Sequence, residues 1–176
     1  MKRNIWILGL ILGAALSFNI FFAVYMCYNK PEFDGNAIVG FAVMIVVFSL
    51  TFFRIRNFRD KQLHGVITFG NALKTGALIV LVASTLYVLV WLFCYYLFVP
   101  DFIDKYIAHA LNQAAREGAS VSELASKTQE MEKFRGMYRN PIMVILLTYM
   151  EVLPVGLVVA LVSAFVLKRK SKDHEG

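Results

Sequence analysis

Few side chains in this sequence are of the types that do chemistry, and their spacing favours no catalytic or metal site. The histidines are His64, His109 and His174, and the cysteines are Cys27 and Cys94. They lie in separate segments, not at the short spacings that hold a metal ion. We therefore predict no catalytic residue, no metal and no cofactor, and we expect a protein that is not an enzyme. Two free thiols and a disulfide both remain open for the cysteines.

One acidic residue stands apart because of the sequence around it. Glu151 lies inside the apolar run of residues 142–167, about ten residues from its start, which is near the middle of a bilayer if the run is a membrane helix. A charged side chain at that depth costs about 2.5–3.5 kcal/mol on insertion scales, so such residues are functional candidates. Counting depth along the other apolar runs places further polar side chains near the same level: Asn19, Ser84, Thr85 and Tyr87.

Two interpretations of Glu151 are open. Glu151 and the polar side chains at its level could form a cluster that binds a proton or a small polar ligand. Alternatively, a neutral Glu151 carboxyl could hydrogen-bond a neighbouring helix and have only a structural role. Pro154 follows on the same run and interrupts the helical hydrogen bonds, which makes it a candidate hinge.

The composition indicates a membrane protein. Hydrophobic residues make up 59% of the 176 residues and charged residues 17%, against about 45–50% and 25% in soluble proteins. Crossing the bilayer takes about 20 apolar residues, and the runs that qualify are 5–26, 37–53, 72–99 and 142–167. The first is too long for a signal peptide and lacks a cleavage site. We predict an all-α, four-helix transmembrane bundle that forms one domain over residues 1–176.

Charge sets the orientation, because cytoplasmic flanks carry an excess of Lys and Arg. That excess lies before the first run, between the second and third, and after the fourth, in Lys2, Arg3, Arg54, Arg56, Arg59, Lys61, Lys74, Lys168, Arg169, Lys170 and Lys172. The other flanks are close to neutral. Both termini are therefore expected in the cytoplasm.

The segment 100–141 is the only long polar stretch between two runs. Its apolar residues recur at helical spacing on both sides of Gly118, and Ser120 with Glu123 has the spacing of a capping box. Pro141 suits the first turn of the last span. We predict an extracytoplasmic helical hairpin between spans 3 and 4.

Small residues recur at four-residue spacing along three spans, which lets helices approach closely. The predicted packing residues are Gly9, Gly13, Ser17, Gly76, Gly156 and Ala160. Packing within the bundle and homo-oligomerisation are both open.

The net charge of +6 points to lipid, not to nucleic acid, because the basic residues flank apolar runs. We predict that the bilayer and its anionic headgroups are partners, with headgroup contacts from Arg54, Arg56, Arg59 and Lys61.

Several stretches along the chain resemble one family of small bacterial membrane proteins, the domain of unknown function 4199. They are Asn57-Phe58-Arg59-Asp60-Lys61, Gly65-Val66-Ile67-Thr68-Phe69-Gly70, Val99-Pro100-Asp101-Phe102, Leu111-Asn112-Gln113-Ala114, and Tyr149-Met150-Glu151-Val152-Leu153-Pro154-Val155-Gly156-Leu157. The resemblance implies a multi-pass protein of the bacterial inner membrane and carries no established activity.

Two functions follow as hypotheses. The first is a non-enzymatic assembly or accessory component of the bacterial envelope, whose hairpin meets an envelope protein partner. The second is a small oligomeric transporter or channel subunit that uses the polar cluster around Glu151.

Overall fold

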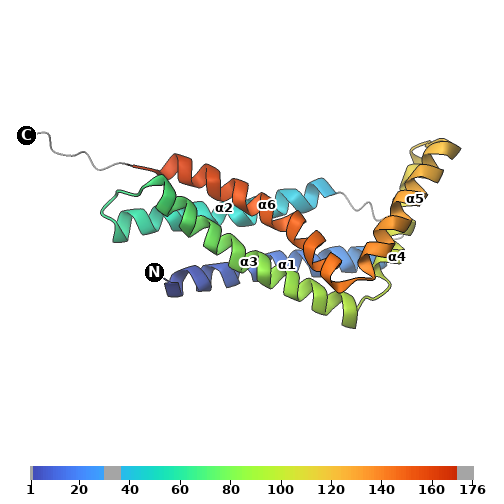
Figure 1. The fold of residues 1–176 in the computed structure, drawn as a ribbon, viewed down its shortest axis with the longest axis horizontal. Coiled ribbons are helices and arrows are strands. Elements are labelled where there is room, and N and C mark those ends of the chain that lie inside the picture. Colours follow the sequence, from blue (N-terminus) through green and yellow to red (C-terminus); the bar gives the residue numbers. More distant parts are fainter. Residues whose placement is uncertain (1, 30–36, 170–176) are drawn as a thin grey trace, which may run out of the picture.

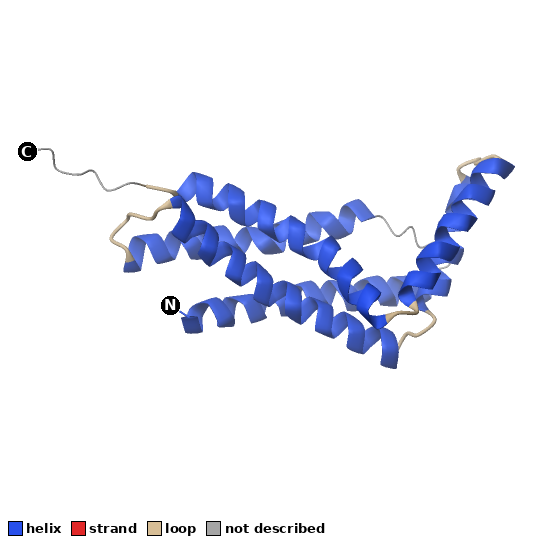
Figure 2. Cartoon of the chain, viewed as in Figure 1, coloured by secondary structure: helices blue, strands red, loops and turns tan. Residues whose placement is uncertain are grey.

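The structure is a computed structural model that describes residues 2–29 and 37–169. Within these residues the chain forms helices joined by short connections, shown in Figure 1 and Figure 2. The helices are α1 (Lys2–Asn29), α2 (Ala37–Gln62), α3 (Phe69–Leu97), α4 (Phe102–Arg116), α5 (Val121–Tyr138) and α6 (Pro141–Leu167). Four of them, α1, α2, α3 and α6, are long and apolar enough to cross a membrane. The all-α class and the four span-length helices are confirmed.

The helices begin and end close to the predicted boundaries, with one large difference. α2 continues to Gln62, well beyond the predicted end at residue 53. Its last part carries Arg and Lys, which end an apolar run but are good helix formers. α3 begins early, at Phe69, because the hydroxyl of Thr68 accepts a hydrogen bond from the backbone of Asn71 at 3.3 Å.

The polar segment between α3 and α6 forms the two expected helices, α4 and α5. Gly118 adopts φ +83° between them, a left-handed conformation that favours glycine. The capping box is present: Ser120 Oγ accepts from the backbone N–H of Glu123, and the Glu123 carboxylate accepts from the backbone N–H of Ser120. Asn140 caps α6, and Pro141 occupies its first turn.

The four long helices run side by side, with α3 in contact with both α1 and α6 while α2 packs mainly on α6. The described chain begins and ends at one end of this bundle, and α4 and α5 lie at the opposite end (Figure 1). We call the latter the α4–α5 end.

Close approach between these helices depends on glycine. A Cβ atom on Gly9 would lie 2.6 Å from Cβ of Val82, and one on Gly156 would lie 2.4 Å from Cγ1 of Val80. A Cβ on Gly76 would similarly lie 2.9 Å from Cβ of Ala160. The small residues of the predicted stripes, including Gly13 and the buried Ser17, therefore lie at contacts between helices of one chain.

Arg59, one of the predicted headgroup contacts, has protein partners that the sequence did not indicate. Its side chain is only 8% exposed, and Nη1 donates to the carbonyl of Leu167 at 3.4 Å while Nε donates to Asp60 at 2.7 Å. It therefore holds the C-terminal end of α6 against α2. Arg56 and Lys61 are exposed and Arg54 is half-buried, so headgroup contacts by these three residues stay a prediction.

We expect Gly156→Ala to destabilise the bundle by about 1–3 kcal/mol, the range for overpacking a filled contact. The new methyl would meet Val80 and the ring of Phe48. Unfolding in mixed micelles measures the change. Gly40→Ala is the matched control on α2, where no atom lies within 4 Å of the new Cβ, and it should be neutral or slightly stabilising. Equal stability of the two variants would contradict the packing described here.

Candidate functional site: a chamber above Glu151

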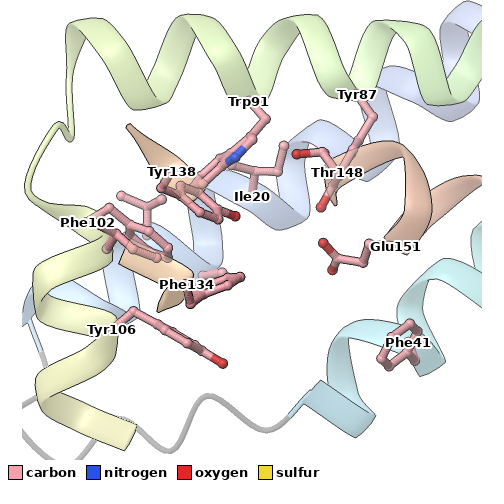
Figure 3. A pocket seen from close by; sticks show the side chains of 13 residues that line it. Ile20, Phe41, Tyr87, Trp91, Phe102, Tyr106, Phe134, Tyr138, Thr148 and Glu151 are labelled. Atoms are coloured by element: carbon pink, nitrogen blue, oxygen red, sulfur yellow. The ribbon is translucent and has the colours of Figure 1, made fainter. Parts of the chain in front are cut away.

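A chamber of about 360 Å³ lies between the long helices at the α4–α5 end. Its walls combine one carboxylate, several hydroxyls and a large aromatic surface (Figure 3). The lining residues are Ile20, Ala23, Val24, Phe41, Tyr87, Trp91, Phe102, Ile103, Tyr106, Phe134, Tyr138, Thr148 and Glu151.

Glu151 projects from α6 into this chamber, and the aromatic residues contributed by α4 and α5 lie to its left in the view of Figure 3. Tyr87 of α3 and Thr148 of α6 line the wall beside it. The Thr148 hydroxyl donates to the carbonyl of Val144 at 2.8 Å, so its oxygen lone pairs remain available to a ligand. Glu151 therefore lies in a partly open space between the helices, where its side chain remains exposed and is not packed against a neighbour.

The aromatic side chains that line the chamber belong to a continuous series of ring contacts across three helices. We call the part contributed by α4 and α5 the roof of the chamber. The ring of Trp91 on α3 meets Phe102 on α4 edge-on at 5.1 Å, and Tyr95 meets Tyr138 on α5 at 5.5 Å. Further contacts join Phe102 to Tyr106, Tyr106 to Phe134, and Phe134 to Tyr138. Edge and offset contacts of this kind are favourable beyond their burial, so the roof is fixed to α3.

Burial in this roof raises the pKa of the Tyr138 phenol above its ordinary value, and the negative charge of Glu151 raises that pKa further. The phenol therefore stays protonated near neutral pH and keeps a hydrogen-bond donor.

Polar contacts at the chamber's edge fasten α4 to α1. The phenol of Tyr28 on α1 donates a hydrogen bond to Asp101. Lys105 lies 3.2 Å from the Asp101 carboxylate and 3.4 Å above the ring of Tyr28. One turn further along α4, His109 Nε2 lies 3.2 Å from the carbonyl of Cys27. We call Tyr28, Asp101 and Lys105 the α1–α4 latch.

An ion pair connects the two helices of the roof. Arg135 of α5 lies 2.8 Å from Asp104 of α4 and 2.6 Å from Glu132 of its own helix. With the latch and the aromatic contacts, this pair sets the position of α5 relative to α1 and α3.

The predicted polar cluster is only partly assembled. Tyr87 lines the chamber with Glu151, but Asn19, Ser84 and Thr85 are not among its lining residues. Ser84 is fully buried. The Thr85 hydroxyl accepts from Tyr149 at 2.8 Å and donates to the carbonyl of Leu81.

The candidate hinge Pro154 lies within α6, which continues through it. Pro154 lines a different, apolar groove between α2 and α6. Because proline has no N–H, the carbonyl of Met150 lacks its usual helical partner. A hinge motion there stays a prediction.

Sequence reasoning missed Thr148 and the aromatic residues of the chamber other than Tyr87. Thr148 precedes Glu151 by a helical turn, so it lies on the same face of α6. Tyr87 and Trp91 are one turn apart on α3, as are Phe134 and Tyr138 on α5. Such pairs of aromatic residues one helical turn apart are the signal in the sequence that could have indicated an aromatic wall. Both cysteines are free and buried.

The comparisons with known proteins agree with the resemblance seen in the sequence. The family described as Protein of unknown function (DUF4199) matches residues 7–169. The chain belongs to this family. Neither the search of curated proteins nor the search of solved structures gives a match. The match covers most of α1 and all of the helices from α2 to α6, so the chamber lies within the matched residues.

The α1–α4 latch predicts a stability that depends on pH. The hydrogen bond from Tyr28, supported by Lys105, holds the pKa of the Asp101 carboxyl below its ordinary 3.8. A depressed pKa contributes stability that is present above the ordinary value and lost as the pH falls through the folded value. The difference in Tm between the wild-type protein and Asp101→Asn should therefore be largest near neutral pH and vanish in acid.

Thermal unfolding in detergent at a series of pH values measures this difference. Tyr28→Phe should reduce it, because the principal donor to Asp101 is removed. Asp104→Asn is the control, since it breaks the α4–α5 ion pair and leaves the latch intact. A difference in Tm that is the same at every pH would contradict the assignment.

Proposed function

We propose that this chain is a multi-pass membrane protein, without enzymatic activity, that binds a small molecule in the chamber beside Glu151. The observation that carries the proposal is the position of this carboxylate, in a hollow between helices at the depth of a span's middle. Acids at such depth are unfavourable in lipid and are common where membrane proteins bind substrates or move protons. The chamber volume of about 360 Å³ falls in the range of small-molecule sites.

The location that fits is the bacterial cytoplasmic membrane, with both termini in the cytoplasm. Support comes from the exposed basic side chains at the end of the bundle opposite α4 and α5, among them Arg56, Lys61 and Lys168. The positive-inside rule assigns that end to the cytoplasm. The α4–α5 pair then forms the extracytoplasmic hairpin, and the chamber lies in the outer half of the bilayer beneath it.

A binding chamber in the outer half of the membrane suits the transporter or channel subunit predicted from the sequence. Many large apolar side chains of the span-length helices are exposed, including Phe18, Phe21, Val46 and Val166. Lipid or a second copy of the chain would cover them. Four spans are few for a transport path, so this function implies a homo-oligomer.

The chamber proposal is tested by filling the space. Ala23 lines the chamber from α1, and Ala23→Phe should occupy part of it. We expect at least one class in a panel of small cationic, neutral and anionic aromatic compounds to raise the Tm of the wild-type protein. That increase should be lost in Ala23→Phe, since the compound and the new ring compete for the same volume.

Ala15→Phe is the matched control, because Ala15 is exposed on the same helix and lies outside the chamber. It should keep the increase in Tm. If no compound stabilises the wild-type protein more than it stabilises Ala23→Phe, the chamber is not a ligand site.

A second candidate function is an accessory role in the envelope, through contact of the hairpin with a protein partner. α5 favours it, because this helix has no buried residue and Val121 at its start is 87% exposed. Affinity purification in mild detergent with and without residues 101–140 tests it. An unchanged set of partners would count against this role.

A further inference from the structure

The charges around the chamber are unbalanced. Among the lining residues that the structure describes, Glu151 is the one formally charged side chain, and none is Lys, Arg or His. The ion pairs found in residues 2–29 and 37–169 join Arg56 and Arg59 to Asp60, Lys105 to Asp101, and Arg135 to Asp104 and Glu132. None of them involves Glu151. The Glu151 side chain is exposed within the chamber, and an ionised carboxylate at this depth of a membrane span is favourable only beside a positive partner or water. The lining residues that the structure describes do not supply a positive partner.

The rest of the lining is suited to a positive charge that carries apolar substituents. Most of the aromatic side chains gather at the α4–α5 end of the chamber, and Tyr87 lies nearer to Glu151 (Figure 3). Those at the α4–α5 end are Trp91, Phe102, Tyr106, Phe134 and Tyr138. The faces of aromatic rings carry negative potential and attract cations, above all ammonium groups with alkyl substituents. An anion is disfavoured in this chamber, because the Glu151 carboxylate and the faces of the aromatic rings both repel negative charge.

We propose that the ligand of this chamber is an organic cation, with its ammonium group beside the Glu151 carboxylate and its apolar body against the aromatic wall. This inference rests on the proposed function of the chamber and names the class of molecule it takes. The phenols of Tyr87, Tyr106 and Tyr138 are the other titratable groups that line the site. Among the described lining residues, Glu151 is therefore the one acidic side chain that can supply a full negative charge.

The volume limits the size of the cation. At about 30 Å³ for each non-hydrogen atom, the share of a water molecule in the liquid, 360 Å³ holds about a dozen such atoms. Benzyltrimethylammonium is a cation of this size. Neopentylbenzene has the same shape with carbon in place of nitrogen and no charge, so the pair isolates the effect of charge.

Trp91 supplies a reporter within the site itself. The sequence contains two tryptophans, and the other, Trp6, is exposed on α1 and does not line the chamber. In a Trp6→Phe background, purified in a maltoside detergent that lacks ammonium groups, the fluorescence of Trp91 measures binding. We expect benzyltrimethylammonium to change this fluorescence saturably and neopentylbenzene to bind at least about tenfold more weakly.

Glu151→Gln keeps the shape of the side chain and removes its charge. The affinity for benzyltrimethylammonium should fall at least about tenfold in this variant. The attraction between two full charges at contact distance contributes more free energy than a tenfold change in affinity requires. Affinity for neopentylbenzene should hardly change. Glu130→Gln, on the exposed surface of α5, removes the same charge outside the chamber and should leave both affinities unaltered.

The ammonium group could come from a free cation or from a lipid headgroup, and competition separates these sources. If phosphatidylethanolamine added to the micelles displaces benzyltrimethylammonium and phosphatidylglycerol does not, the occupant is a headgroup. If neither lipid competes, the occupant is a free organic cation. Both results keep the ammonium group in the site.

The inference is overturned if neopentylbenzene binds as tightly as benzyltrimethylammonium, a result that needs no variant to fold. It is also overturned if Glu151→Gln binds the cation with unchanged affinity, or if the cation does not bind at all. In each case the Ala23→Phe comparison decides separately whether the chamber binds some other ligand. A neutral or anionic compound that needs the open chamber would sustain the proposed function and refute the cation.

Discussion

The arrangement of this bundle depends on how closely α3 approaches its neighbours. Apolar side chains gain little from leaving lipid for a helix interface, so membrane helices associate through packing and small residues. Gly9 and Gly13 bring α1 onto α3, while Gly76 and Gly156 bring α3 onto α6. At each of these positions a single Cβ atom would lie within 2.9 Å of a facing atom. The helix pairs therefore have little freedom to shift along these contacts.

The closest contacts of α6 with α3 lie towards the end where the described chain begins and ends, and this explains where the chamber forms. Gly156 and Ala160 meet Val80 and Gly76 there. Towards the α4–α5 end the lining of α3 and α6 changes to Tyr87, Trp91 and Thr148, and the helices enclose a hollow instead of a filled contact. The aromatic series and the α1–α4 latch hold α4 and α5 over it.

The sequence predicts the helices far better than it predicts the site. Apolar runs locate the spans, and the capping box of Ser120 and Glu123 locates the start of α5, because both signals are local. Counting depth along the helices predicts Thr85 and Tyr87 at the level of Glu151. In the structure Thr85 hydrogen-bonds Tyr149, whereas Tyr87 lines the chamber. The depth of a residue in the membrane follows from the rise along its helix. The direction in which its side chain points relative to the other helices depends on how those helices pack, which a single sequence does not give. The protein partners of Arg59 were not foreseen for the same reason, since one of them is the carbonyl of Leu167, far away in the sequence.

One face of α6 packs against other helices, and a different face lines the chamber. Gly156 and Glu151 are separated by about 140° around the helix at 100° per residue, so the glycine meets α3 and α2 while the carboxylate points into the chamber. A residue on the packing face could not be acidic without a buried unpaired charge. A residue facing lipid would meet the same penalty with no partner in reach. Of the three environments, packing face, lipid-facing surface and chamber, the chamber is the one that accommodates a carboxylate. There a proton or a bound cation can neutralise its charge.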